Sequence, residues 1–290
     1  MKRIIIALLL LPLCVALLFI TDFLTGYSVN EDVSYGDTDA NVMDIFMPSN
    51  LSETEGAVLF IHGGSWSGGD KAEEEIRCRI LANSGYIAAT MNYTLYSDDT
   101  QMEHEVDVVL DEITSALEQL KSFAADQGVT IEKVGISGYS AGAHLAMLYS
   151  YSRADESPVE IAFVSSMAGP ADISREVWGD QTALTIGNWL SIENITPTMF
   201  GNGQADKILS DISPITYVGE NTPPTMLIHG SMDNVVPIEN AENLMEKLDE
   251  FGIDYDYINL PDSDHSLLQN PKMHLDYYLL LIDYCDESLK

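Results

Sequence analysis

The sequence predicts an α/β fold in which a mostly parallel sheet is covered by helices on both faces. Short, continuous apolar runs alternate with longer segments whose apolar residues recur at three- and four-residue spacing. A strand that is apolar on both sides must be covered on both faces, and strands that alternate with helices form parallel sheets. The chain has 290 residues, of which 46% are hydrophobic, so it is long enough for one large domain with a full core.

The predicted strands follow one another in order. Residues 42–47 are apolar apart from Asp44 and precede the first parallel strand, so we expect them in an antiparallel hairpin. The parallel strands are the apolar runs at residues 57–61, 86–91, 134–136, 161–164, 225–228 and 255–260.

Helices are predicted between these strands. Residues 239–251 have an apolar stripe, and the apolar segment 275–282 closes the fold. The clearest helix lies between the second and third parallel strands, where the three- and four-residue spacing links Val106, Val109, Leu110, Ile113, Leu117 and Leu120.

Residues 169–218 interrupt this alternation. They contain no long apolar strand, and their tryptophans are scattered through short helical fragments. A stretch of this length is too long for an ordinary loop, so we expect a small cap insertion.

The N-terminus predicts export. Met1-Lys2-Arg3 precedes an uncharged, apolar run that extends to Ile20, as in an export signal. Because no good cleavage site follows, residues 1–26 are either a cleaved signal peptide or an uncleaved membrane anchor. The domain proper is expected over residues 31–290, in a secreted protein or one anchored to the outer face of the cytoplasmic membrane.

Charge and cysteine content exclude several functions. The net charge of −33 argues against nucleic-acid binding, and it limits any membrane contact to the N-terminal segment. The three cysteines form no metal-binding motif, so we predict no metal and no cofactor. Catalysis would therefore depend on serine, histidine and carboxylate side chains.

Gly138-Tyr139-Ser140-Ala141-Gly142 is the most informative segment, since it joins a predicted strand to a predicted helix. A turn this sharp leaves no space for side chains two residues either side of the serine. It would raise the Ser140 hydroxyl above the sheet, near the positive end of a helix. Ser140 is therefore the candidate nucleophile.

A serine nucleophile needs a base and an orienting carboxylate, which should follow in the order serine, acid, histidine at successive strand ends. Asp233 lies in the loop after strand 225–228, and His265 lies in the loop after strand 255–260. A histidine ordinarily has a pKa of about 6.5, which suits proton transfer near neutral pH. His274 is the rival base, whereas His144 is expected to be a packed structural residue and His229 to orient the acid loop.

The loop His62-Gly63-Gly64-Ser65-Trp66 follows the first parallel strand. Adjacent glycines allow backbone N–H groups to crowd a ligand, so Gly63, Gly64 and Ala141 are the candidate oxyanion hole. His62 would brace the loop. Trp66 and Tyr139 are the candidate walls of the substrate pocket, although Trp66 could instead pack beneath the loop.

Taken together, these motifs resemble those of α/β-hydrolases, specifically bacterial esterases and lipases with a His-Gly-Gly loop. The resemblance is closest to the exported feruloyl and acetyl-xylan esterase-like branch, and it covers roughly residues 33–268. It implies the α/β-hydrolase fold and the roles given above to Ser140, Asp233 and His265. Two positions depart from the family pattern: Ser65 replaces a common third glycine, and Asn92 replaces a common aspartate.

The resemblance implies a serine carboxylesterase that hydrolyses short-chain acyl esters through an acyl-enzyme. Its substrate would be a small-molecule or polysaccharide-linked ester, with acetyl and feruloyl groups as candidates. A serine exopeptidase-like hydrolase of the same fold is one alternative, and a non-catalytic binding module is another. The sequence leaves the oligomeric state open.

Two cysteines carry a further expectation. The helix after the His-Gly-Gly loop and the C-terminal helix usually flank each other in such folds, and they carry Cys78 and Cys285. We expect the two cysteines to lie near each other, where they would be able to form a disulfide after export.

Overall fold

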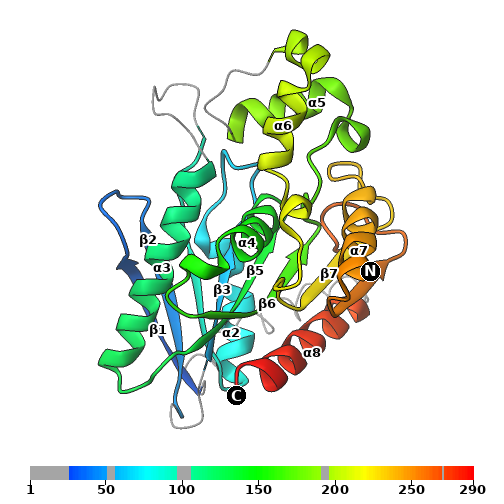
Figure 1. Cartoon of the computed structure of the whole chain (residues 1–290). Coiled ribbons are helices and arrows are strands. Elements are labelled where there is room, and N and C mark those ends of the chain that lie inside the picture. Colours follow the sequence, from blue (N-terminus) through cyan, green and yellow to red (C-terminus); the bar gives the residue numbers. More distant parts are fainter. Residues whose placement is uncertain (1–25, 51–55, 97–105, 191–195, 270) are drawn as a thin grey trace, which may run out of the picture.

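The computed structural model describes residues 26–50, 56–96, 106–190, 196–269 and 271–290 (Figure 1). The predicted signal peptide or anchor lies outside these residues, apart from Gly26. None of the helices in the described ranges is long and apolar enough to cross a membrane.

The centre of the molecule is an eight-stranded sheet with the order β1-β2-β4-β3-β5-β6-β7-β8. β2 pairs antiparallel with both β1 and β4, whereas every pair from β4 to β8 is parallel. The predicted mostly parallel sheet and its antiparallel hairpin are therefore confirmed. The strands are β1 (Tyr27–Ser34), β2 (Val42–Pro48), β3 (Gly56–Ile61), β4 (Ile87–Met91), β5 (Lys133–Tyr139), β6 (Glu160–Met167), β7 (Thr225–Gly230) and β8 (Tyr255–Leu260).

Helices cover both faces of the sheet because successive strand residues point to opposite sides. In β3, Leu59 and Ile61 pack in one apolar cluster with α3 (Val106–Asp126), α4 (Ala141–Ser152) and α7 (Glu239–Phe251). Val58 and Phe60 pack in a second cluster with α2 (Glu75–Asn83) and α8 (Pro271–Ser288). A short 3-10 helix, η2 (Lys71–Glu74), leads into α2, and another, η3 (Ala154–Glu156), follows α4.

Both cysteines expected to form a disulfide are in the second cluster. Cys78 in α2 and Cys285 in α8 are completely buried, and both are free thiols. The structure therefore contains no disulfide between them.

The described part of residues 169–218 is helical, with no strand. It comprises α5 (Arg175–Leu190), η4 (Pro197–Asn202), α6 (Gln204–Asp211) and η5 (Pro214–Tyr217), and α5 is kinked at Gly179. α5 and α6 stand together at one end of the molecule (Figure 1). The start of the segment is fastened to α7, because the buried Asn240 side chain accepts the N–H groups of Ala171 and Asp172 at 3.0 Å.

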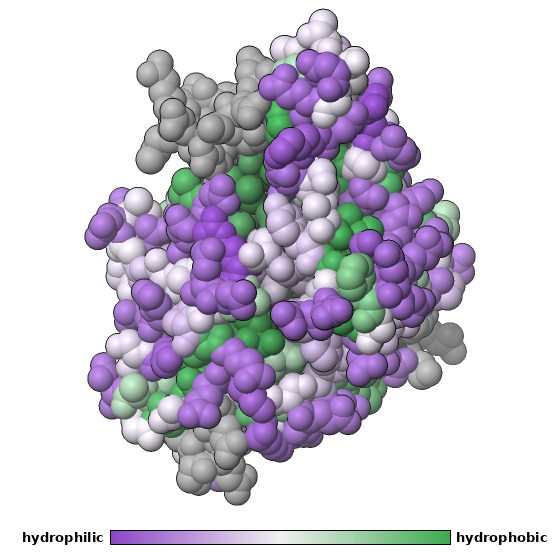
Figure 2. Space-filling model, in the orientation of Figure 1, coloured by the Kyte–Doolittle hydropathy of each residue, from purple (hydrophilic) through white to green (hydrophobic). Residues whose placement is uncertain are grey.

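The surface reflects the composition. Hydrophilic side chains cover most of the face shown in Figure 2, and apolar ones appear mainly in its hollows. A net charge of −33 makes such a surface repel polyanions.

Candidate active site

Ser140 lies at the sharp turn between β5 and α4. Its φ of 53° and ψ of −119° are unfavourable for a residue with a side chain, at a cost of about 1 kcal/mol or more. A Cβ on Gly138 would lie 2.3 Å from the Gly142 carbonyl carbon, and one on Gly142 would lie 2.0 Å from the Ile61 oxygen. The predicted need for both glycines is confirmed.

The structure brings Ser140, His265 and Asp233 together in line. His265 Nε2 lies 2.9 Å from Ser140 Oγ, and His265 Nδ1 lies 2.7 Å from Asp233 Oδ2. When Nδ1–H donates to the carboxylate, Nε2 is left without a proton and accepts the serine hydroxyl. The geometry therefore allows a proton to move from Ser140 to His265.

Asp233 is held as a carboxylate. Its Oδ1 accepts the N–H groups of Val235 and Val236, each at 2.9 Å, and its Oδ2 faces both His265 and His229. Burial alone would raise the pKa of Asp233. The hydrogen bonds from the two histidines and the two N–H groups outweigh burial, so the pKa lies well below its usual range.

The remaining histidines are placed as follows. His229 Nε2 donates to the Val236 carbonyl at 3.0 Å and lies 3.4 Å from Asp233 Oδ2, so it contacts the acid loop as expected. His144 is fully buried inside the fold. The side chain of His274, the rival base, is outside the described part of the molecule.

The loop after β3 packs directly on the turn that carries Ser140. A Cβ on Gly63 would lie 3.0 Å from the Tyr139 oxygen and 3.4 Å from Ser140 Cβ. Gly64 has a φ of 110°, and a Cβ there would lie 2.1 Å from the Gly68 oxygen. Ala141 is the first residue of α4, and the first N–H groups of a helix have no partner within it. Gly63 and Ala141 therefore flank Ser140 from two sides.

Ser65 and Trp66 continue this loop with φ values of 52° and 58°, in the region that favours glycine. This conformation explains why glycine is common at position 65 in the family that the sequence resembles. His62 braces the loop, since its Nδ1 lies 2.7 Å from the Gly63 oxygen and its ring stacks on Tyr93.

Asn92, the second departure from that family, does not reach the catalytic groups. Its Oδ1 accepts the Lys71 N–H at 2.6 Å, and its Nδ2 donates to Asp70 at 3.2 Å. An amide both accepts and donates at this point, where a carboxylate would only accept. Asn92 therefore fastens the start of η2 behind the loop.

The two predicted pocket residues have different surroundings. Trp66 is 7% exposed, packs beneath the loop and donates its indole N–H to His144 Nδ1 at 3.2 Å. Tyr139 donates its hydroxyl to the His265 carbonyl at 2.7 Å and supports the His265 ring with its own. The sequence predicted neither hydrogen bond. The position of Tyr139, directly before the serine at a strand end, was the only signal for its contact.

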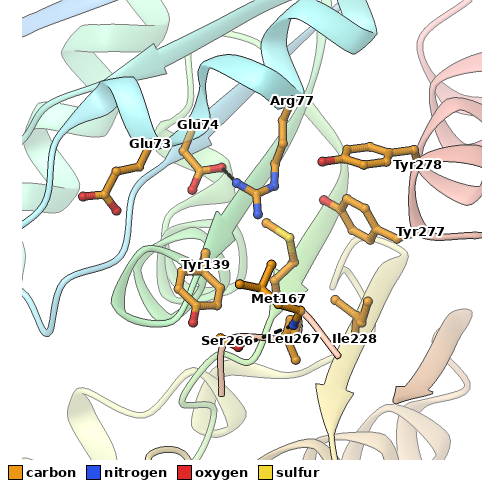
Figure 3. A pocket seen from close by; sticks show the side chains of 11 residues that line it. Glu73, Glu74, Arg77, Tyr139, Met167, Ile228, Ser266, Leu267, Tyr277 and Tyr278 are labelled. Carbon is orange, nitrogen blue, oxygen red and sulfur yellow. Dashed lines mark hydrogen bonds and ion pairs between the residues drawn. The ribbon is translucent and has the colours of Figure 1, made fainter. Parts of the chain in front are cut away.

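Tyr139 also lines a cavity of about 290 Å³ (Figure 3). Arg77 extends into this cavity and pairs with the buried Glu74 at 2.6 Å. The Nε atom of Arg77 has no hydrogen-bond partner among the described residues. The remaining lining residues are Glu73, Met167, Ile228, Ser266, Leu267, Leu268, Tyr277 and Tyr278. Tyr139 and Ser266 adjoin Ser140 and His265 in the chain, but no triad residue lines the cavity itself.

Trp66 lines a smaller, aromatic pocket. Its walls include Tyr93, Tyr96 and Trp189, and the rings of Tyr96 and Trp189 are 5.9 Å apart. Within the described ranges, no cluster of three or more histidine, cysteine or acidic side chains is arranged to hold a metal ion.

Comparisons with known proteins agree with this architecture. Residues 43–248 match the BD-FAE family. Esterase LipC of Mycobacterium tuberculosis is 26% identical over 246 residues, which cover 82% of this chain and 60% of that protein. The chain therefore spans about 60% of the length of this curated relative.

Two solved structures have the same fold. A truncated carbohydrate esterase from gut microbiota superposes with a TM-score of 0.71 at 20% identity, over 90% of this chain and 98% of that one. Esterase B of Lactobacillus rhamnosis superposes with a TM-score of 0.70 at 21% identity, over 89% and 85%. With its α/β-hydrolase fold and a match over most of its length, the chain belongs to the BD-FAE family.

Proposed function

We propose that this protein is a serine carboxylesterase that cleaves short-chain acyl esters through an acyl-enzyme on Ser140. The observation that carries the proposal is the aligned contact of Ser140 Oγ with His265 Nε2 and of His265 Nδ1 with Asp233. A serine hydroxyl is a weak nucleophile unless such a base removes its proton. The esterases among the relatives and solved structures support the same reaction class.

The proposed reaction has two halves. Ser140 Oγ attacks the ester carbonyl carbon while its proton passes to His265 Nε2, and the N–H groups of Gly63, Gly64 and Ala141 stabilise the resulting oxyanion. His265 then protonates the alcohol oxygen, the C–O bond breaks, and the acyl group remains on Ser140. Water repeats the attack with His265 as base and releases the carboxylic acid, while Asp233 stabilises the imidazolium in both halves.

We propose that the alcohol is rich in hydroxyl groups, as in an acetylated or feruloylated polysaccharide. Ser266, which lines the cavity of Figure 3, directly follows His265, the residue that must protonate the leaving alcohol. The polar side chains of this cavity include Arg77 and the aromatic Tyr278. Hydrogen-bond donors combined with aromatic rings suit the polar edges and apolar faces of a sugar.

Hydrolysis of a series of p-nitrophenyl esters with increasing acyl length tests the proposal. We expect the highest kcat/KM for acetyl to butyryl esters, and a loss of roughly 10⁴-fold or more in Ser140→Ala. A fluorophosphonate probe should label the wild type and leave Ser140→Ala unlabelled. No turnover of any ester by the wild type, or full turnover in the variant, would refute the mechanism.

The alternatives are outcomes of a second set of assays. Hydrolysis of aminoacyl amides without hydrolysis of esters would indicate an exopeptidase-like enzyme. Absence of both activities and of probe labelling would indicate a non-catalytic binding module. Release of acetate or ferulate from decorated xylan faster than from the matching methyl ester would support the polysaccharide substrate.

Export, with the N-terminal segment either removed or retained as an anchor, remains part of the proposal. The basic residues Lys2 and Arg3 ahead of the apolar run support it. Cell fractionation followed by N-terminal sequencing of the mature protein tests both versions. Recovery of the intact chain in the cytosol would contradict them.

A further inference from the structure

His144 connects three segments that meet beneath the active site. It lies one turn into α4, where its own N–H donates to the Ser140 carbonyl at 3.0 Å. Its Nδ1 accepts the indole N–H of Trp66 at 3.2 Å, and its Nε2 lies 2.8 Å from the Ile212 carbonyl. Trp66 belongs to the oxyanion loop, and Ile212 directly follows α6 in the segment 169–218.

Only one form of the imidazole satisfies both side-chain contacts. Nδ1 must carry no proton in order to accept from Trp66, and Nε2 must carry one in order to donate to Ile212. Complete burial lowers the pKa of His144 to about 4, against a smaller opposing effect of the Ile212 hydrogen bond. The ring is therefore neutral at ordinary pH, with its tautomer set by its two neighbours.

The oxyanion loop requires such an attachment. Ser65 and Trp66 both adopt φ values in the left-handed region, which side chains disfavour, so the loop would relax if nothing held it. The Trp66 carbonyl accepts the Tyr96 N–H at 2.8 Å. The indole ring of Trp66 stands edge-on to the His144 ring, with ring centres 5.3 Å apart. Trp66 is thus fixed through its backbone on one side and through His144 on the other.

We propose that His144 is a positioning residue that holds the oxyanion loop in its working conformation by joining Trp66 to the segment that ends at Ile212. The inference rests on the proposed esterase function. It assigns His144 no contact with substrate, because the ring acts only through the backbone N–H groups of Gly63 and Gly64. The hydrogen bonds between Ile212 and His144 and between His144 and Trp66 would transmit a displacement of the chain at Ile212 to the loop that carries these N–H groups.

The test compares variants of the full chain by kcat and KM for p-nitrophenyl acetate, with active sites counted by fluorophosphonate labelling. His144→Leu removes both hydrogen bonds, whereas His144→Asn keeps an acceptor near Nδ1. Trp66→Phe removes the indole donor and retains an aromatic ring. Tyr149→Phe is the matched control, since Tyr149 is a buried residue of the same helix and the substitution removes its partly buried hydrogen bond to Thr114, away from the loop.

We expect His144→Leu to lower kcat about tenfold or more with KM within about twofold, because oxyanion contacts act mainly in the transition state. His144→Asn should recover most of this loss, and Tyr149→Phe should change only the melting temperature. The double variant of His144→Leu and Trp66→Phe should be no worse than the poorer single variant.

An unchanged kcat per active site in His144→Leu, or additive losses in the double variant, would overturn the proposal. If His144→Leu does not fold, Trp66→Phe carries the test on its own. If the wild type hydrolyses no ester, the proposed function fails separately. The labelling rate of Ser140 by the fluorophosphonate then replaces kcat, because the phosphonyl oxygen also needs the oxyanion hole.

Discussion

The two loop regions that meet at Ser140 are held by different forces. On the acid–base side, Asp233 accepts hydrogen bonds from two N–H groups and lies against two histidines, so charge organises the loops after β7 and β8. On the oxyanion side, the loop after β3 is held by close backbone packing, strained φ angles and neutral hydrogen bonds. Proton transfer thus depends on charge, whereas oxyanion binding depends on shape.

This difference predicts opposite sensitivities. Substitutions that preserve shape and remove charge should damage the acid–base side, and an added methyl group should damage the oxyanion side.

Asp233→Asn should lower kcat by roughly 10⁴-fold while the protein remains folded. The amide keeps the size of the carboxylate, but it loses the charge and favours the wrong tautomer of His265. Steady-state kinetics with p-nitrophenyl acetate would measure the loss. Asp264→Asn is the matched control, because Asp264 is an exposed neighbour of His265 whose side chain bonds locally, to Ser266 and Gln269. A loss of similar size in the control would contradict the division.

Gly64→Ala should lower kcat by about 10²- to 10³-fold, the usual effect of losing an oxyanion donor. Its Cβ would lie 2.1 Å from the Gly68 oxygen, so the loop must move. Gly85→Ala is the control for backbone strain without a clash. Gly85 also has a positive φ, of 94°, but a Cβ there meets nothing within 4 Å. Gly85→Ala should reduce stability and leave kcat unchanged. Equal kinetics in the two variants would show that the loop tolerates the methyl group.

Acid should destabilise the acid–base side selectively. The folded-state pKa of Asp233 is depressed, so its contribution to stability is complete above the unfolded pKa of about 4 and is lost as pH falls below that value. The contribution of one such carboxylate is about 2 kcal/mol. Urea unfolding at pH 6 and pH 3 should show a larger decrease in the free energy of unfolding for the wild type than for Asp233→Asn. Parallel decreases would mean that other carboxylates dominate.

Tyr139→Phe should have the smallest effect, about 1 kcal/mol of stability and a few-fold decrease in kcat. The substitution removes the hydrogen bond to the His265 carbonyl at 2.7 Å and leaves the ring contact in place. Thermal unfolding and kinetics would measure both. Tyr278→Phe, which lines the same cavity from α8, should not alter kcat for a small ester.

The sequence predicted those structural features that depend on residues close together in the chain. Apolar runs predicted the parallel strands, although Asp256 and Asn259 interrupt the last of them, and the two glycines around Ser140 predicted the turn. Strand lengths were harder to predict, and β5 extends to Lys133–Tyr139 rather than ending at Ile136. Gly135, Ser137 and Gly138 break its apolar run, and Gly135 is small because the Phe163 ring occupies the space of its side chain.

The unpredicted features depend on partners far away in the chain. β1 begins at Tyr27, before residue 31, where the domain was expected to start. Its residues are half-buried or exposed, and a bulge between Asn30 and Val33 breaks any alternation. The Trp66–His144 hydrogen bond joins residues 78 positions apart. Such contacts follow from the completed fold, so a single sequence carries no local signal for them.

The two buried thiols allow the opening of one side of the molecule to be measured by their rate of alkylation. Burial raises the pKa of both Cys78 and Cys285, so neither ionises or meets a reagent while α2 and α8 are packed on the sheet. In a Cys14→Ser background, the alkylation rate of the native protein therefore reports how often this layer opens. The two thiols belong to the second apolar cluster, whereas α4 packs in the first, so alkylation modifies the face of the sheet opposite α4.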